Sequence, residues 1–418
     1  MQEPAWGLLV LRKLKEKYWS YNSRKRLEAS LALPDNRVFS EYVKAEQEEV
    51  LGLAAQGIPN QIEERLDAAV NWLSRAQNAT DDDGVSLGYF PLSGQGRWRP
   101  SYPETTGYII TSLLNYAREF ECEDIASAAL NMADWEIEVQ MMSGAVQGGA
   151  VCLPGQQTAA AFNTGMVADG WMSAYEYTGD QAYLDAALRA SRFLADDLDE
   201  SGFFRTNGDF VRGGEVKTYT CLCAWAMYRA ALAADDSFLR DSAIRAIEAA
   251  LCQRNELGWF KNNCLTDSHA PLTHTIGYAL QGIFEVGVLA ARKDFVEAAK
   301  DSLAGALSSL QHNGYLSARL DSEWKPQADY VCLTGSAQLA ILCFRFAEQF
   351  NATDFLEAGH KLTSFVKATQ LLVSTNESMV GAIAGSYPIL GEYMVGGYPN
   401  WATKYFIDAL MLQRKFLH

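Results

Sequence analysis

The chain has 418 residues, of which 49% are hydrophobic and 21% are charged. This composition supplies ample material for a buried core and excludes a disordered or fibrous protein. Lys and Arg number 35 against 51 Asp and Glu, so the formal net charge is −16. An acidic field of this size repels polyanions, and we therefore expect no nucleic-acid partner.

Residues 1–57 are expected to form a helical extension ahead of the main domain, with a hinge at 31–37, which contains Pro34. Residues 1–30 carry seven Lys and Arg among large apolar side chains. Such a segment can lie on a membrane surface, but packing against its own domain is the favoured interpretation. The apolar run at 6–11 is too short for a signal-peptide core and basic residues follow it, which favours a cytoplasmic protein.

An internal repeat of about 59 residues organises the rest of the chain. In each repeat a threonine lies in the first turn of an apolar helical segment: Thr106, Thr164, Thr220, Thr275, Thr334 and Thr403. A helix that is apolar on almost all sides is buried on most sides, so we predict six inner helices. More charged, one-sided helices follow the first five, and residues 62–77 supply the sixth outer helix.

Alternating inner and outer helices predict an all-α fold, an (α/α)6 toroid of six helical hairpins spanning 58–418. The connections that lead from outer back to inner helices are long: 78–103, 142–162, 198–217, 254–272, 311–329 and 371–400. Function usually lies in long loops on a rigid scaffold. The N-termini of the inner helices meet on the same face, which favours a negatively charged ligand there.

Three phrases of the sequence extend this interpretation: Tyr102-Pro-Glu-Thr-Thr-Gly-Tyr108, Tyr177-Thr-Gly-Asp-Gln-Ala-Tyr-Leu184 and Leu272-Thr-His-Thr-Ile-Gly-Tyr278. With the helical repeat, they make the chain similar to the six-hairpin glycosidase-like superfamily of (α/α)6 toroids. The phrases resemble proteins encoded with bacterial exopolysaccharide genes and, more distantly, the catalytic domain of D-glucuronyl C5-epimerases. The resemblance implies carbohydrate chemistry, but such toroids include hydrolases, lyases and epimerases.

Chemically useful side chains stand just before the repeat threonines, at the expected mouth of the ring: Glu104, Asn163, Tyr219, His274 and Trp401. Tyr108 and Tyr278 lie one turn further in, Lys404 follows an anchor threonine, and Asp329 and Tyr330 precede the fifth inner helix. We expect these residues to surround one opening.

Glu104 is a candidate general acid or base with Asp329 as its partner, because glycoside hydrolysis uses two carboxyl groups. The structural alternative is a carboxylate that only complements the helix dipole. His274 could deprotonate a carbon next to a uronate carboxylate, with Tyr219 or Tyr278 delivering a proton on the other side. Its alternative is a buried histidine that bonds the neighbouring repeat.

The remaining candidates are expected to bind substrate. Arg99 or Lys217 would neutralise a carboxylate, whereas Trp98 and Trp401 would stack on sugar rings. The other binding candidates are Tyr108, Asn163, Tyr278, Tyr330 and Lys404.

The eight cysteines form no C-x-x-C pair and no Cys and His cluster has ligand spacing, so we expect no metal and no cofactor. The favoured function is cleavage of glycosidic bonds in a bacterial, anionic oligo- or polysaccharide of exopolysaccharide metabolism, with hydrolysis favoured over elimination. The alternatives are a uronate epimerase and a non-catalytic glycan-binding component of an exopolysaccharide assembly.

Overall fold

The computed structural model describes residues 29–32, 37–56, 61–92, 97–153, 155–211 and 215–417. Residues 1–28, where most of the basic N-terminal segment falls, and residues 33–36 of the expected hinge lie outside these ranges. The helix α2 (Arg37–Gln56) comes first, and its buried face packs on α13 (Thr353–Thr369). In the described part of the chain no helix is long and apolar enough to cross a bilayer.

Six inner and six outer helices alternate within residues 61–417, as far as these are described. The inner helices are α4 (Pro103–Phe120), α6 (Ala161–Thr178), α8 (Cys223–Ala233), α10 (Thr273–Leu289), α12 (Leu333–Phe350) and α14 (Asn400–Arg414). The outer helices are α3 (Ile62–Gln77), α5 (Glu123–Val139), α7 (Gln181–Asp197), α9 (Ser237–Leu251), α11 (Lys293–Leu307) and α13. The predicted (α/α)6 toroid is confirmed.

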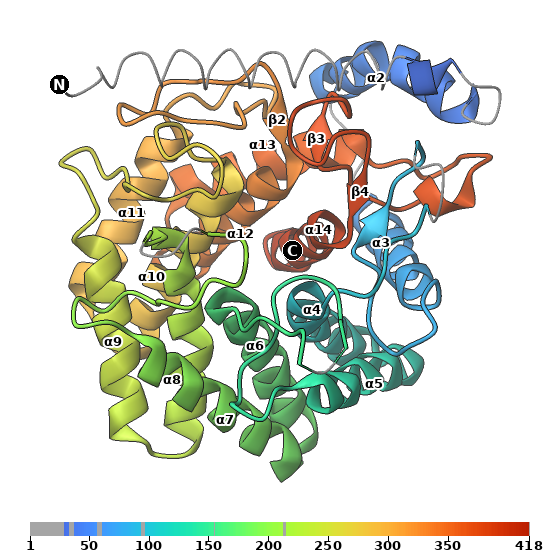
Figure 1. Ribbon diagram of the computed structural model, residues 1–418. Coiled ribbons are helices and arrows are strands. Elements are labelled where there is room, and N and C mark those ends of the chain that lie inside the picture. The colour runs from blue at the N-terminus through green and yellow to red at the C-terminus, as the bar shows by residue number, and fades with distance from the viewer. Residues whose placement is uncertain are drawn as a thin grey trace, which may run out of the picture.

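The ring is closed rather than an open arc, as Figure 1 shows. Each inner helix contacts the next one around the ring, and α14 contacts α4 to complete it. The final hairpin pairs α14 with α3, so it combines the last and the first helix of the ring. A two-residue ladder, β1 (Gly88–Tyr89) with β4 (Tyr398–Pro399), joins the same two regions.

Three of the six repeat threonines accept hydrogen bonds from the loops that precede their helices. Val85, Val146 and Ile383 donate their N–H groups to the hydroxyls of Thr106, Thr164 and Thr403 at 2.9, 2.8 and 3.0 Å. Each contact satisfies a buried backbone donor. The third inner helix differs, because the 3₁₀ helix η2 (Thr218–Leu222) leads into α8 and Thr220 lies within this turn.

Glycines allow the inner helices α4 and α6 to approach closely. A Cβ atom on Gly107 would lie 2.5 Å from the Cα of Val167, and one on Gly170 would collide with the carbonyl oxygen of Gly107. This close packing brings the first turns of α4 and α6 near each other. The candidate site occupies the end at which the inner helices begin.

Candidate functional site

Glu104 lies in the first turn of α4, directly after Pro103, and its side chain is half-buried. The positive end of a helix dipole lowers the pKa of a carboxyl. At Glu104 burial outweighs this effect and raises the pKa to about 8. Within the described residues the carboxyl has no hydrogen bond or ion pair, so at neutral pH it is a protonated acid that water can still reach.

Six tyrosines lie close enough to this carboxyl for its charge to raise their pKa values: Tyr102, Tyr108, Tyr219, Tyr278, Tyr393 and Tyr405. Burial is the first cause that raises each phenol pKa, and the charge of Glu104 adds to it. The rings of Tyr108 and Tyr405 lie 5.6 Å apart, and those of Tyr278 and Tyr405 6.1 Å apart. The phenols are therefore hydrogen-bond donors rather than bases at neutral pH.

His274, on the first turn of α10, packs against the same group of tyrosines. Its Nδ1 lies 2.8 Å from Oε1 of Gln338 on α12, so Nδ1–H donates and Nε2 keeps its lone pair. Its ring lies 4.3 Å from Tyr278 and 5.5 Å from Tyr393, measured between centroids. Burial lowers the pKa of His274 to about 4, so the imidazole is neutral above that pH.

Tyr393 and Trp401 form the partly exposed rim of the site. The indole Nε1 of Trp401 donates to the hydroxyl of Tyr393 at 2.8 Å. Both side chains are half-buried. Tyr393 was not among the sequence candidates, because it comes from the loop between outer helix α13 and α14 and precedes the last repeat threonine by ten positions. Only its place in the last long connection could have drawn attention to it.

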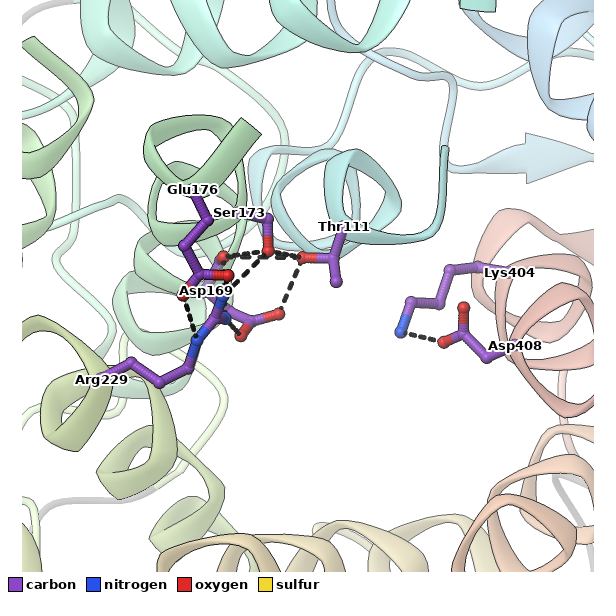
Figure 2. Close-up of polar contacts among 7 residues, drawn as sticks. All are labelled: Thr111, Asp169, Ser173, Glu176, Arg229, Lys404 and Asp408. Atoms are coloured by element: carbon purple, nitrogen blue, oxygen red, sulfur yellow. Dashed lines mark hydrogen bonds and ion pairs between the residues drawn. The ribbon is translucent and has the colours of Figure 1, made fainter. Parts of the chain in front are cut away.

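Lys404 lies deeper in the lumen, under the tyrosines. Its Nζ is 2.7 Å from the carboxylate of Asp408 and 4.1 Å from the ring centroid of Tyr405. Together with Tyr108 and Asp169 it lines a small pocket that has room for about one water molecule. Figure 2 shows Lys404 facing, across the lumen, a second polar group formed by Thr111, Asp169, Ser173, Glu176 and Arg229.

Asn163 lies in the first turn of α6, and Lys217 and Tyr219 lie at the start of η2. Two of the three have structural partners. Asn163 is buried and donates from Nδ2 to the carbonyl oxygen of Gln147 at 3.1 Å. Lys217 is 7% exposed and its Nζ lies 3.2 Å from Glu215. The Tyr219 ring lies 5.3 Å from that of Phe162, so it extends the aromatic lining.

Four other candidates, Trp98, Arg99, Asp329 and Tyr330, lie in the loops, and the first two are near the point where the ring closes. Trp98 packs on Trp72 and Tyr89, with centroids 5.4 and 5.1 Å apart, near the ring closure. Arg99 lies over the ring of Phe90. Neither has a contact with Glu104 among the described residues.

The structure does not assemble the expected pair of Glu104 and Asp329. Asp329 is exposed and its charge acts on Tyr315, outside the lumen. Tyr330 is buried in a small cluster with Cys264 and Leu272, and Tyr393 of the rim packs against this cluster. The reason is a pairing between distant segments: β2 (Val331–Cys332) pairs with β3 (Ser386–Tyr387) and fixes the path of the residues before α12.

In the part of the chain that the structure describes, no three His, Cys, Asp or Glu side chains gather as a metal site would require. A scan of the sequence against protein-family models finds no match, and a search of curated proteins finds none either.

Solved structures do share the fold. A heparin-specific unsaturated glucuronyl hydrolase superposes with a TM-score of 0.67 at 13% identity, over 85% of this chain and 97% of that one. An unsaturated glucuronyl hydrolase from Bacillus sp. GL1, described as responsible for glycosaminoglycan degradation, gives 0.66 at 14%, over 84% and 96%. An alpha-amylase from Clostridium perfringens gives 0.60 at 9%, over 85% and 99%. The chain therefore shares the (α/α)6 toroid fold of these three enzymes.

Proposed function

We propose that this protein is a glycoside hydrolase with Glu104 as its general acid, acting on oligosaccharides that carry an acidic sugar. The observation that carries this proposal is a half-buried carboxyl with a pKa of about 8 at the mouth of the ring. An acid that keeps its proton at neutral pH can give it to a glycoside during bond cleavage. Such groups gather at functional sites because burial there shifts their pKa toward the working pH.

The same site argues against elimination and epimerisation. Both reactions begin with removal of a proton from carbon, which needs a base. The tyrosines around Glu104 have pKa values raised above the ordinary range, so their phenolates are costly to form. The pKa of His274, about 4, makes its imidazole a weak base. Acid catalysis therefore fits these groups better than proton abstraction.

The number of carboxyl groups favours one class of substrate. Hydrolysis of an ordinary glycoside uses two carboxyls that flank the bond. Burial is the only cause that shifts the pKa of Glu104, so among the described residues no second carboxylate acts on it. An unsaturated uronyl sugar is an enol ether, so one acid suffices. Glu104 gives its proton to the carbon of the C=C bond that does not carry the ring oxygen, and the ring oxygen stabilises the cation at the other carbon. Water adds to this cation and returns a proton to the Glu104 carboxylate. The hemiketal then opens to a ketone and a hemiacetal, and the hemiacetal releases the neighbouring sugar as an alcohol.

The substrate class also agrees with the names of the two similar hydrolases, which act on unsaturated glucuronyl compounds. In our proposal Trp401 and Tyr393 stack on the sugar, His274 Nε2 accepts a hydrogen bond from a hydroxyl, and Lys404 attracts the carboxylate. We propose bacterial exopolysaccharide fragments as the source of such sugars.

Two matched substrates test the proposal: an oligosaccharide that ends in an unsaturated uronyl residue and the same oligosaccharide with a saturated end. We expect the ultraviolet absorbance of the unsaturated end to disappear and mass analysis to show addition of one water and release of the shortened chain. The saturated oligosaccharide should remain intact. Binding of both without turnover would contradict a hydrolase and support a glycan-binding protein.

A further inference from the structure

Tyr393 lies in a loop, residues 389–396, that folds back on itself. The N–H of Gly396 donates to the carbonyl oxygen of Ile389 at 2.8 Å, which closes the base of the loop. The hydroxyl of Ser386 donates to the carbonyl oxygen of Tyr393 at 2.6 Å and accepts its N–H at 3.2 Å. The backbone of Tyr393 is thus held relative to the residues just before the loop.

The base of this loop is also bonded to α2, outside the ring of hairpins. The N–H of Ile389 donates to both carboxyl oxygens of Glu46, at 3.0 and 2.9 Å. The hydroxyl of Tyr42, one turn earlier on α2, donates to the same carboxyl at 3.4 Å. Ile389 therefore connects the two parts, because its N–H bonds Glu46 and its carbonyl oxygen closes the loop.

Glu46 is 1% exposed, and no cation pairs with it in the described residues. The rest of the contacting face of α2 is apolar and includes Phe39, Val43 and Val50. Burial of a carboxyl is costly, so an apolar residue at this position would be expected if α2 only covered the surface. The carboxyl provides what an apolar residue lacks, an acceptor for the N–H at the base of the Tyr393 loop.

We propose that Glu46 is a positioning residue that holds the 389–396 loop so that Tyr393 lies against His274 and Trp401 at the rim of the site. This inference rests on the proposed function for its catalytic consequence. Its structural part depends only on the contacts of Glu46, Ile389 and Tyr393. Glu46 acts through the loop and does not touch the reacting atoms.

Amide hydrogen exchange and steady-state kinetics of two variants of the full chain test the proposal. Glu46→Leu removes the acceptor, and we expect backbone amides of 386–397 to exchange about tenfold faster. KM for the unsaturated oligosaccharide should rise about tenfold while kcat changes less than about threefold. Glu46→Gln keeps an oxygen for the Ile389 N–H, and both quantities should remain within about threefold of the natural chain.

Glu49→Leu and Glu49→Gln are the matched controls, because Glu49 lies exposed on the same helix. Both should leave exchange and kinetics unchanged. Unchanged exchange at 386–397 in Glu46→Leu, or equally fast exchange in Glu46→Gln, would overturn the proposal. An increase spread over all inner helices would also overturn it, since Glu46 would then support overall stability. If no oligosaccharide is cleaved, the proposed function fails while exchange still decides the role of Glu46.

Discussion

The imidazole of His274 and the side-chain amide of Gln338 face each other across two neighbouring inner helices, with Nδ1 and Oε1 2.8 Å apart. This contact fixes the orientation of the ring and leaves Nε2 as the free acceptor. Because burial keeps the imidazole neutral, the only group at the mouth that holds a transferable proton near neutral pH is Glu104, as far as the described residues show. The chemistry of the site therefore depends on one carboxyl.

Glu104→Gln tests that dependence directly. The amide fills the same space but has no acidic proton, so kcat should fall by about 10²-fold to 10⁴-fold with little change in KM. Turnover of the unsaturated oligosaccharide measures both constants. Glu138→Gln, an exposed change on α5, is the control and should retain full activity. A Glu104→Gln variant with normal kcat would leave the carboxyl with only a structural role.

The pH profile of kcat/KM should have a plateau with two limits. Glu104 must be protonated to act as an acid, and its pKa is raised to about 8, so activity should fall as the pH rises through about 8. His274 must be neutral to accept a hydrogen bond, so activity should also fall below about pH 4. Initial rates across this range give the profile. An optimum confined to pH values above 8 would argue for a base instead.

Glu136 on α5 should make the fold sensitive to alkaline pH. Its side chain is fully buried, both carboxyl oxygens lack a partner among the described residues, and burial followed by the charge of Asp82 raises its pKa. A carboxyl with a raised folded-state pKa contributes stability below its unfolded pKa of about 4.3 and loses it as the pH rises. Glu136→Gln removes this titration.

Thermal unfolding measured from pH 5 to pH 9 tests this point. As the pH rises, the free energy of unfolding of the Glu136→Gln variant should increase relative to that of the natural chain, by about 1–3 kcal/mol at pH 9. Glu138→Gln, exposed on the same helix, should follow the natural chain throughout. If the difference in unfolding free energy between the natural chain and the Glu136→Gln variant were the same at all pH values, Glu136 would not titrate on unfolding.

The close approach of α4 and α6 predicts opposite effects for two identical substitutions. Gly107→Ala places a methyl group against the backbone of Val167. It should lower the free energy of unfolding by about 1–3 kcal/mol, although alanine has the better helix propensity. Gly52→Ala in α2 meets no atom within 4 Å, so it should stabilise the protein by about 0.5–1 kcal/mol. Denaturant unfolding of both variants checks the signs. Equal effects would mean that the two helices can move apart freely.

Buried ion pairs between the inner helices should contribute more to the free energy of unfolding than exposed pairs on the outer surface. Arg229 pairs with Asp169 and Glu176, and the side chains of Arg229 and Asp169 are only 12% and 8% exposed. Arg229→Met leaves Asp169 buried without a counterion and should cost about 3–5 kcal/mol. Arg240→Met breaks the pair with Asp235, which is 92% exposed, and should cost less than about 1 kcal/mol. Adding Asp169→Leu to Arg229→Met should recover most of the loss.

The sequence predicted the fold well because its repeat has a local physical cause. The hydroxyls of Thr106, Thr164 and Thr403 accept N–H groups from the loops that precede their helices, which explains the threonine in these three repeats. Those of Thr220 and Thr275 donate to carbonyl oxygens just before them. Once six hairpins close into a ring, residues one turn on either side of the threonines converge. Glu104 and His274 could therefore be placed at one mouth from spacing alone.

The loop residues could not be placed in this way. Trp98 lies on Trp72 because the β1 and β4 segments join the two ends of the ring, and Asp329 points outward because β2 pairs with β3. Both pairings connect segments far apart in the chain, and neither has a periodic signal. Tyr393 was missed for the same reason, since its position follows from contacts with Ser386 and Ile389 rather than from the repeat.

Closure of the ring by α3 and α14 has a consequence for biosynthesis. Five hairpins can form in order as the chain leaves the ribosome, but α3 must wait for α14, its partner in the sixth. Until then, the apolar flanks of α4 and α12 that α14 covers are open to water. The nascent polypeptide is consequently at greater risk of aggregation until α14 has left the ribosome and can pack between α12 and α4.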